Sequence, residues 1–278
     1  MHTSQQTMES LERRSLQDVA NLALNAAARF WFGVAVIGQL LFACYVLVFY
    51  GGAVVKGNLA LWNKVLPQGY VPGDTAGNLA IAMHMLMAVI ITVGGALQLV
   101  PQVRARAPRF HRVNGRVYVL FAVMASIIGL YMVWVRGSLG SLAQHLAISF
   151  NAVLIMLCSF MAVRHARARN LAVHRRWALR LFLVVSGVWF FRVGLMFWIV
   201  VNQGPVGFDP VTFQGPFLVF LTFAQTMLPL AVLELYLWAQ QRAGAAGRLA
   251  TAAAIGTLTI AMGGGICAAF LLLWRPHM

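Results

Sequence analysis

Charged residues are scarce in this chain. They make up 10% of its 278 residues, whereas a soluble domain carries about 25%. Hydrophobic residues make up 61%, and several apolar runs reach the roughly 20 residues that a helix needs to cross a ~30 Å hydrocarbon core. These proportions exclude an ordinary soluble domain and predict an all-α fold class, a polytopic integral membrane helix bundle.

Acidic residues are scarcer still. Six Asp and Glu stand against 21 Lys and Arg, which gives a formal net charge of +15. Nucleic-acid binding would suit such a charge, but the arginines lie beside apolar runs, as orientation in a membrane by positive charge requires. We therefore expect the lipid bilayer, and no nucleic acid, as the partner of this charge.

Cysteines and catalytic motifs are also few. The three cysteines, Cys44, Cys158 and Cys267, all fall in apolar runs. An odd number on different helices argues against a disulfide framework, so we expect buried thiols. The sequence contains no phosphate-binding loop, no nucleophile elbow and no HExxH zinc motif.

Seven apolar runs are long enough to be transmembrane helices. They cover about residues 30–50, 78–100, 114–135, 141–163, 176–201, 214–240 and 250–274. Residues 30–275 are therefore expected to form a single transmembrane domain, preceded by a cytoplasmic N-terminal segment at residues 1–29. That segment is predicted to contain an interfacial helix with four residues on its apolar side: Leu11, Leu16, Val19 and Leu22.

Residues 51–77 contain glycine, proline and two lysines. We expect this segment to be an extramembrane loop with a short amphipathic piece around Trp62. Asp74, and Asp209 in a later loop, are expected to be solvated on the outer side.

Positive charge is distributed unevenly between the two ends of the spans. With a cytoplasmic N-terminus, four cationic residues lie outside: Lys56, Lys64, Arg136 and Arg275. Sixteen lie inside: Arg13, Arg14, Arg29, Arg104, Arg106, Arg109, Arg112, Arg116, Arg164, Arg167, Arg169, Arg175, Arg176, Arg180, Arg242 and Arg248. Cytoplasmic loops carry the excess of Lys and Arg, so the count predicts that the N-terminus is cytoplasmic.

Four of the seven histidines occupy related positions. His84 lies about 9 Å along the second span, and His145 lies near the start of the fourth. Both spans run inward, so this pair shares the outer half of the membrane. His111 stands just before the third span and His174 just before the fifth, so the second pair shares the inner interface.

Spans two to five look like a duplicated two-helix unit. His84 and His111 are 27 positions apart, and His145 and His174 are 29 positions apart. The sequences at the two inner histidines are alike, HRVNGR at 111–116 and HRRWALR at 174–180. Hairpins of the same topology would be related by an axis along the membrane normal. Coincidence is the alternative for so short a repeat.

Two neutral imidazoles at each of two depths suit two b-type haems with histidine on both faces. Up to two haems are therefore expected, with iron ligands in two pairs: His84 with His145, and His111 with His174. Flanking arginines would bind haem propionates: Arg112, Arg116 and Arg175. The alternatives are interfacial histidines in basic loops and ordinary packing of the small residues on the histidine faces. Zinc or copper would need more ligands converging at one point.

Arg192 lies inside the fifth span, eighteen residues after His174. On an unbroken helix it would share the face of His174, about 27 Å further on. A charge within a span is a functional candidate, so we expect Arg192 to bind an anionic group of the cofactor; snorkelling to the outer surface is the alternative. Glu234, the only acid inside a span, is expected to be protonated or paired with Arg242, and not with Arg192.

These residues together resemble a bacterial family of predicted membrane proteins of unknown function, numbered 2306 (DUF2306). The resemblance covers roughly residues 30–240 and includes Gly94-Gly95, the two basic helix starts at His111 and His174, Arg192 and Glu234. It implies a multi-pass protein of the bacterial inner membrane. The four-histidine pattern also resembles the cytochrome b561 class, which implies transmembrane electron transfer through two haems. It departs from that class because the inner histidines stand at the very start of their helices.

Three function classes remain open from the sequence. The first is a transmembrane electron carrier or oxidoreductase, with a quinol or soluble reductant inside and a metal ion or redox partner outside. The second is a transporter or channel, favoured by the duplicated hairpins, by Pro229 breaking span six, and by mid-membrane Gln225 and Asn151. The third is a scaffold or assembly subunit. A visible absorption spectrum separates the first class from the others.

Overall fold

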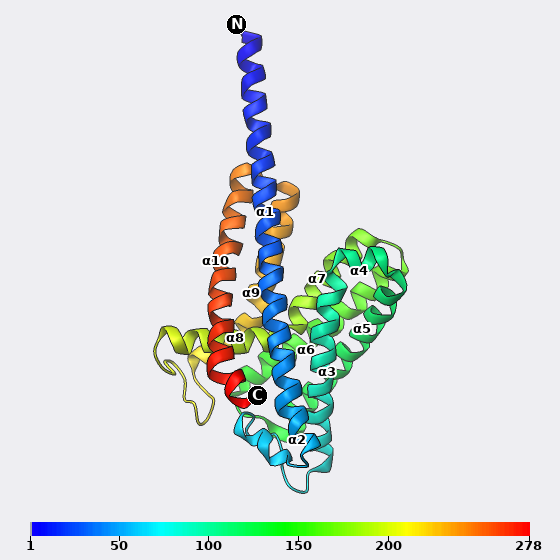
Figure 1. Ribbon diagram of the computed structural model, residues 1–278, viewed down its shortest axis with the longest axis vertical. Helices are drawn as coiled ribbons and strands as arrows, with labels where there is room; N and C mark the ends of the chain where they lie inside the picture. Colours follow the sequence, from blue (N-terminus) through cyan, green and yellow to red (C-terminus); the bar gives the residue numbers. More distant parts are fainter. Residues whose placement is uncertain (1) are drawn as a thin grey trace.

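The computed structural model describes residues 2–278, and their side chains from residue 15 onward. The chain is built from helices (Figure 1). The long ones are α1 (His2–Val46), α3 (Thr75–Leu99), α5 (Pro108–Tyr131), α6 (Leu142–Arg167), α7 (Leu171–Val185), α8 (Gly187–Val201), α9 (Pro216–Arg242) and α10 (Ala245–Ala269). Short pieces extend or connect them: η1 (Leu47–Gly51), α2 (Gly52–Val55), η2 (Leu59–Lys64), α4 (Pro101–Arg106), η3 (Met132–Gly137), η4 (Phe270–Trp274) and η5 (Arg275–His277).

The predicted helix bundle is confirmed. Six helical stretches are long and apolar enough to cross a membrane, and there are seven if the bent pair α7–α8 is counted as one broken span. The first span is longer than expected, because α1 runs without a break through the N-terminal residues and projects beyond the bundle (Figure 1). Leu16, Val19 and Leu22 are exposed on this extension; they belong to the continuous helix and not to a separate interfacial one. The side chain of Leu11 lies outside the described residues.

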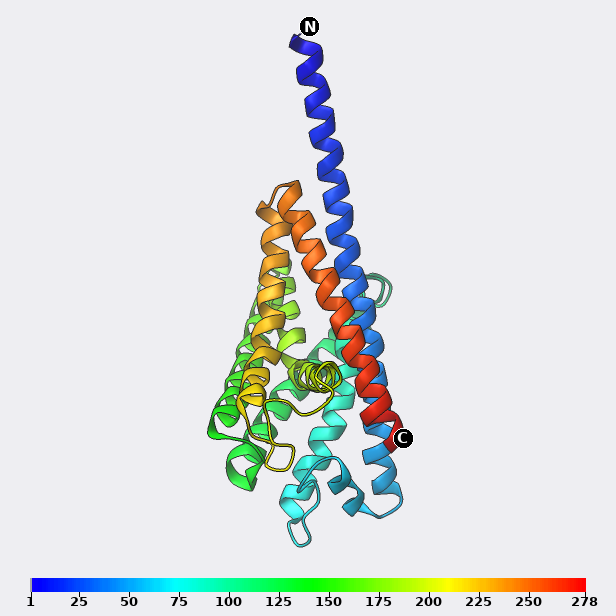
Figure 2. The ribbon, with the colours of Figure 1, turned by 90° about the vertical axis from the view of Figure 1, so that its left-hand side faces the viewer.

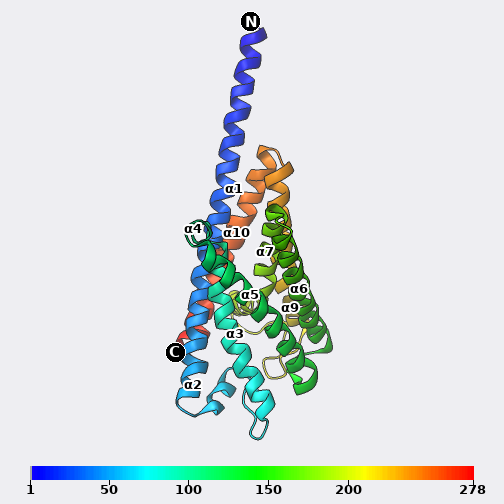
Figure 3. The same cartoon turned by 90° about the vertical axis from the view of Figure 1, so that its right-hand side faces the viewer.

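The helices form two groups. In the first group, α1 packs along α10. α9 joins them at the end of the bundle from which the N-terminus projects, through a buried cluster that includes Leu24, Ala239 and Ile255. The other group is a four-helix unit in which α5 lies between α3 and α6, and α7 packs on α6 (Figure 3). At the end of the bundle from which the N-terminus projects, α9 and α10 extend further than α4 to α7 do (Figure 1). The four-helix unit contains the four histidines of interest.

Span five is broken, which the sequence analysis did not predict. α7 and α8 meet at an angle of 51°, at Ser186 and Gly187, and Ser–Gly pairs are a usual cause of helix kinks. Two polar side chains contact the break. Gln39 of α1 donates a 2.9 Å hydrogen bond to Ser186 Oγ, and Asn151 of α6 lies against Gly187. α8 therefore crosses the bundle, and it is seen end-on in Figure 2.

Two smaller expectations were wrong. Cys158 is buried, but Cys44 and Cys267 are exposed, because their faces of α1 and α10 point away from the core. Pro229 lies inside an α9 that continues to Arg242, so the interrupted span is the fifth and not the sixth.

Segment 51–77, expected from the sequence to be an outer loop, is more ordered than a simple loop. Trp62 of η2 is 1% exposed, and its indole N–H donates a 3.2 Å hydrogen bond to the carbonyl of Tyr50. This bond holds η2 against the outer end of the first span. The amphipathic piece expected around Trp62 is thus a short 3-10 helix with its tryptophan buried.

Asp74 is not merely solvated, as the sequence had suggested. It caps α3 by accepting the N–H of Gly77 at 2.9 Å, and it binds Arg136 Nε at 2.8 Å. The Gly77 N–H, and then Arg136, hold the pKa of the Asp74 carboxyl below its usual value. Asp209 accepts the N–H of Val211 at 2.7 Å in the loop before α9, which likewise lowers its pKa. The Asp74–Arg136 pair ties the start of α3 to η3, the short helix that continues α5.

Asp74→Asn should lower the melting temperature at pH 7, since Asn keeps a capping side chain but loses the charge that binds Arg136. A lowered pKa in the folded state means that the carboxylate stabilises the fold above its ordinary pKa, and that this stability is lost as the pH falls through the lowered value. The wild type should therefore lose stability on acidification toward about pH 3, and the variant should lose less. Thermal unfolding of the detergent-solubilised protein at both pH values measures this. Asp18→Asn, an exposed position on α1, is the charge-matched control, and equal melting temperatures at pH 7 for wild type and Asp74→Asn would contradict the prediction.

Candidate functional site

The four histidines lie on four different helices of one unit. His84 is on α3, His111 on α5, His145 on α6 and His174 on α7. A buried apolar layer fills the middle of this unit: Met87 and Ile91 of α3, Tyr118 and Ala122 of α5, Ile155 and Cys158 of α6, and Leu181 and Val184 of α7. Along α5, this layer begins about 10 Å beyond His111. The layer separates the inner histidines from the outer ones.

The inner pair, His111 and His174, lies at one end of the unit. His111 is in the first turn of α5 and His174 in the first turn of α7, and the two imidazoles lie within electrostatic reach of each other. The Nδ1–H of His174 donates a 2.9 Å hydrogen bond to the carbonyl of Ala162 on α6. In neutral imidazole this tautomer leaves Nε2 free to act as a ligand. His111 Nδ1 is buried and has no hydrogen-bond partner.

A side chain that the sequence analysis missed supports this end of the unit. Gln98, at the end of α3, donates a 3.0 Å hydrogen bond to the backbone carbonyl of His111. One turn of α3 earlier, Gly94 accepts a 2.9 Å hydrogen bond from Asn114. These bonds join the inner ends of α3 and α5 and hold the helix turn that carries His111. The signal was the polar Gln98 within an otherwise apolar run.

The outer histidines lie against different parts of the helical stretch formed by α5 and η3. His84 faces Gly129, where an added methyl group would stand 3.8 Å from its Cε1 atom. His145 Nε2 is 3.2 Å from Ser138 Oγ, and its ring meets the indole of Trp134 edge-on at 5.9 Å. Trp134 and Ser138 are five and nine residues beyond Gly129 toward the outer end. Among the described side chains no contact joins the two outer rings, although His84 Nδ1 is buried without a partner.

Arg192 faces α1 and does not share a helix face with His174. The break at Ser186 turns α8 away from the axis of α7, so the expected shared face does not exist. The Arg192 guanidinium lies 5.5 Å from the centre of the Phe42 ring and donates a 3.3 Å hydrogen bond to the carbonyl of Val188. It is within electrostatic reach of His84.

Polar side chains of the first span lie near Arg192 and near the break in span five. The charge of Arg192 also reaches Tyr45 of α1 and Tyr50 of η1. Tyr45 is 1% exposed and Gln39 is 3% exposed, yet the Tyr45 hydroxyl and Gln39 Oε1 have no hydrogen-bond partner. Neither of the two ion pairs formed among residues 15–278 involves Arg192. A cation with only one carbonyl contact in an apolar span favours a bound anion beside it.

Glu234 pairs with Arg180, so the expected pairing with Arg242 is wrong. The two hydrogen bonds, from Arg180 Nε and a terminal nitrogen to the two carboxylate oxygens, measure 2.7 and 3.0 Å. The Arg180 guanidinium also lies 4.8 Å from the centre of the Trp177 ring. A two-pronged pair of this kind ties α7 to α9 near the arginine-rich end.

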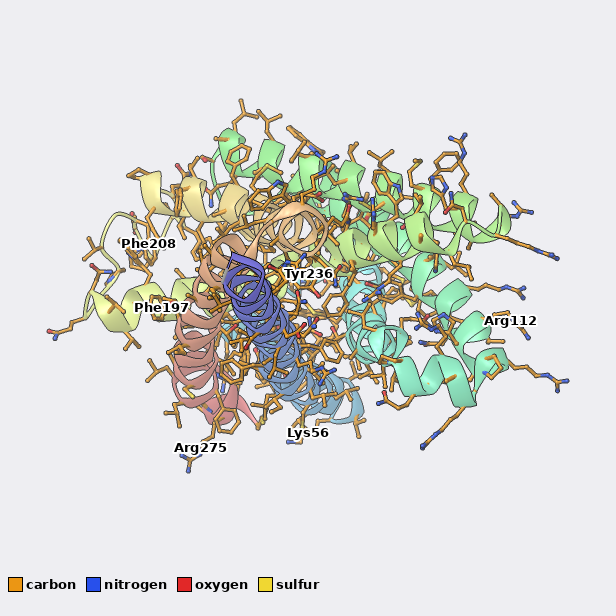
Figure 4. All side chains as sticks on the ribbon, turned by 90° about the horizontal axis from the view of Figure 1, so that it is seen from above. Lys56, Arg112, Phe197, Phe208, Tyr236 and Arg275 are labelled. Carbon is orange, nitrogen blue, oxygen red and sulfur yellow. The ribbon has the colours of Figure 1, made fainter. Side chains whose placement is uncertain are left out.

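The arginines expected at the propionates lie on the surface. Arg112, Arg116 and Arg175 are all exposed, and Figure 4 shows Arg112 at the rim of the bundle, pointing outward. Arg104 of α4 is instead the arginine within electrostatic reach of His111. Within the described part of the chain, no three His, Cys, Asp or Glu side chains converge on a point that would hold a metal ion.

Residues 81–228 match the model of a family described as predicted membrane protein, DUF2306. The chain belongs to the DUF2306 family. The matched region is more than half of the chain, begins three residues before His84 and ends within α9, so it contains all four histidines and Arg192. It leaves out α1 and α10, which pack against this region from outside. No curated protein and no solved structure matches the chain.

Proposed function

We propose that this DUF2306 protein is a transmembrane electron carrier that binds b-type haem in the four-helix unit, with His111 and His174 as the inner iron ligands. The observation that supports it best is that these two imidazoles, from α5 and α7, lie at one end of the unit within electrostatic reach of each other. A ligating histidine normally donates its other ring N–H to a carbonyl or carboxylate, and the bond from His174 to Ala162 has this form. The buried, unpartnered Nδ1 of His111 also fits a group that is satisfied only on binding.

Bound haem would supply one-electron chemistry, and the chain's residues would set its environment. The apolar layer around Tyr118 and Leu181 would keep water away from one side. Arg104 would raise the positive potential at His111 and attract propionates. The buried hydroxyl of Tyr118, which has no partner, would offer a further hydrogen bond. The donor and acceptor are proposed to be a quinol or another redox partner.

A second, outer haem is part of the same proposal, with His84 and His145 as ligands. His84 fits this role because it is inside the unit and its Nδ1 is unpartnered. His145 fits less well, since its Nε2 is held by Ser138 and its ring lies further out along α5. The outer site therefore requires His145 to leave Ser138, and the inner site requires no such change. The inner histidines therefore fit haem ligation better than the outer ones, although their position at the very start of their helices departs from the cytochrome b561 pattern.

The experiment that tests the proposal is a visible spectrum of the full-length protein, purified in detergent after expression with ample haem supply. A Soret band that shifts on reduction with dithionite, and a pyridine haemochrome of the b type, are the expected results. Purified, monodisperse protein with no Soret band would overturn it.

The break in span five favours a transporter as the second candidate. Discontinuous helices line substrate sites in many transporters, and polar side chains converge on this break. Gln39 bonds Ser186, and Asn151, which lies at Gly187, accepts a 3.0 Å hydrogen bond from Thr226 of α9. A haem-free protein that exchanges a solute across proteoliposomes in a manner lost on Asn151→Leu would support this candidate over the first.

We propose further that the protein lies in the bacterial inner membrane with its N-terminus in the cytoplasm. The arginine-rich segments, namely the start of α5, the α6–α7 turn and the α9–α10 turn, lie toward the end of the bundle from which the N-terminus projects (Figure 1). The segments with few cations lie toward the other end. This separation supports the positive-inside orientation.

Reporter fusions test this orientation. Fusions after residues 110, 170 and 244 should give cytoplasmic activity, and fusions after residues 65, 138 and 207 should give external activity, since these positions alternate between the two ends of the bundle. Paired alkaline phosphatase and green fluorescent protein fusions provide complementary signals at each site. An external signal at residue 170 would contradict the topology and would separate His111 from His174 across the membrane.

A further inference from the structure

Two adjoining cavities lie between α7 and α9, near the arginine-rich end of the bundle. Their volumes are about 230 and 210 Å³. Three residues line both: Arg176 of α7, and Leu237 and Gln241 of α9. Tyr236, which lines the first cavity, lies near the centre of the bundle when it is viewed from this end (Figure 4). The two cavities thus form one hollow between the two helix groups.

The walls of this hollow are strongly positive. Arg175 and Arg176 line the first cavity, and Arg176, Arg180 and Arg242 line the second. Glu234 is the one acid among the lining residues, and both of its oxygens are bound to Arg180. Three guanidinium groups therefore have no carboxylate partner there. The hollow is built to receive an anion, and a planar guanidinium is the side chain best suited to phosphate oxygens.

The floor of the hollow is apolar. Leu179 and Leu237 line it, and beneath them lies a buried cluster that includes Phe182, Leu183 and Leu233. Trp238 of α9 lines the second cavity and is 49% exposed. Tryptophan and tyrosine are enriched at the level of lipid headgroups. A ligand in the hollow would therefore contact arginine side chains on its walls and apolar side chains on its floor.

We propose that this hollow binds the phosphate headgroup of an anionic phospholipid, with Arg176 as the central ligand. Basic pockets between transmembrane helices on the cytoplasmic side are suited to such headgroups. Each of the two cavities is smaller than the roughly 300 to 1,000 Å³ of a pocket for a whole drug-sized molecule, so each suits a headgroup, and the acyl chains would extend along the apolar surface of α9. The site is separate from the proposed haem site, because His174 faces Ala162 of α6 whereas the hollow is on the α9 side of α7. The inference does not depend on haem binding.

Thermal stability and lipid retention of the full-length protein test this site. Delipidated protein in neutral detergent should be stabilised by added phosphatidylglycerol and not by phosphatidylcholine, and native mass spectrometry should show one retained phosphatidylglycerol. Arg176→Gln should weaken this binding about tenfold or more, since a hydrogen bond to a charged group is lost. Arg109→Gln, an exposed arginine at the start of α5, removes the same charge elsewhere and should bind as wild type does.

A second variant tests the site independently, in case Arg176→Gln fails to fold. Gln241→Glu keeps every arginine but adds a negative charge to the wall shared by both cavities, and it should also weaken phosphatidylglycerol binding. Equal retention by wild type, Arg176→Gln and Gln241→Glu would overturn the proposal, because binding would then not depend on the charges that line this hollow. Equal stabilisation by inorganic phosphate without lipid would overturn the assignment to a phospholipid.

Discussion

His111→Ala and His174→Ala are each expected to abolish the inner haem. Both rings are needed as axial ligands, and alanine offers no replacement. The helices that carry them would remain in place, because Gln98 binds the backbone carbonyl of His111 and Asn170 caps α7 through the N–H of Val173. The dithionite-reduced minus oxidised spectrum should lose the same absorbance component in both variants, with haem content falling from two per chain to one.

His165→Ala is the matched control. This histidine lies in the last turn of α6, in the same basic region of the sequence, and it is not part of the unit's interior. It should retain the full spectrum. His84→Ala and His145→Ala should remove the other haem, and the two should act alike. If His111→Ala and His174→Ala leave the spectrum of a two-haem protein intact, the inner pair is only interfacial and the proposal for that site is wrong.

Arg192→Leu is expected to change stability in opposite directions with and without a bound cofactor. An arginine inside a span costs at least about 2.5 kcal/mol when nothing neutralises it, so in the ligand-free protein leucine should raise the free energy of unfolding by about that amount. In the cofactor-bound protein the arginine has an anion to bind, and leucine should lower stability. The loss of the contact with Phe42 subtracts about 0.5–2 kcal/mol from the gain in the first case.

The same variant should lower the reduction potential of the outer haem. A positive charge near the iron favours the reduced form, so removing the charge makes reduction harder. Arg192→Lys should have a smaller effect, since the charge is kept and only the two-pronged geometry is lost. Phe42→Leu is the control, because it removes the ring under the guanidinium and leaves the charge. Unchanged stability, spectrum and potential in Arg192→Leu would show that the arginine snorkels to the surface and binds nothing.

Some features followed from the sequence alone. The number of spans and their approximate bounds could be predicted because about 20 consecutive apolar residues are needed to cross a bilayer, and this requirement is local. The distribution of arginines between the two ends is likewise a property of the chain order. The family resemblance, carried by the basic helix starts at His111 and His174 and by Arg192, was also readable and is confirmed.

What only the tertiary structure decided is where side chains from different helices meet. Ser186 and Gly187 permit a kink, but only the contacts with Gln39 and Asn151 show that the fifth span bends there, and the bend turns Arg192 toward α1. A helical repeat assigns a residue to a face; it does not say which neighbour packs against that face. For this reason the pairings of Glu234 with Arg180 and of Asp74 with Arg136, and the approach of His111 to His174 without a matching contact between His84 and His145, appear only once the helices are packed together.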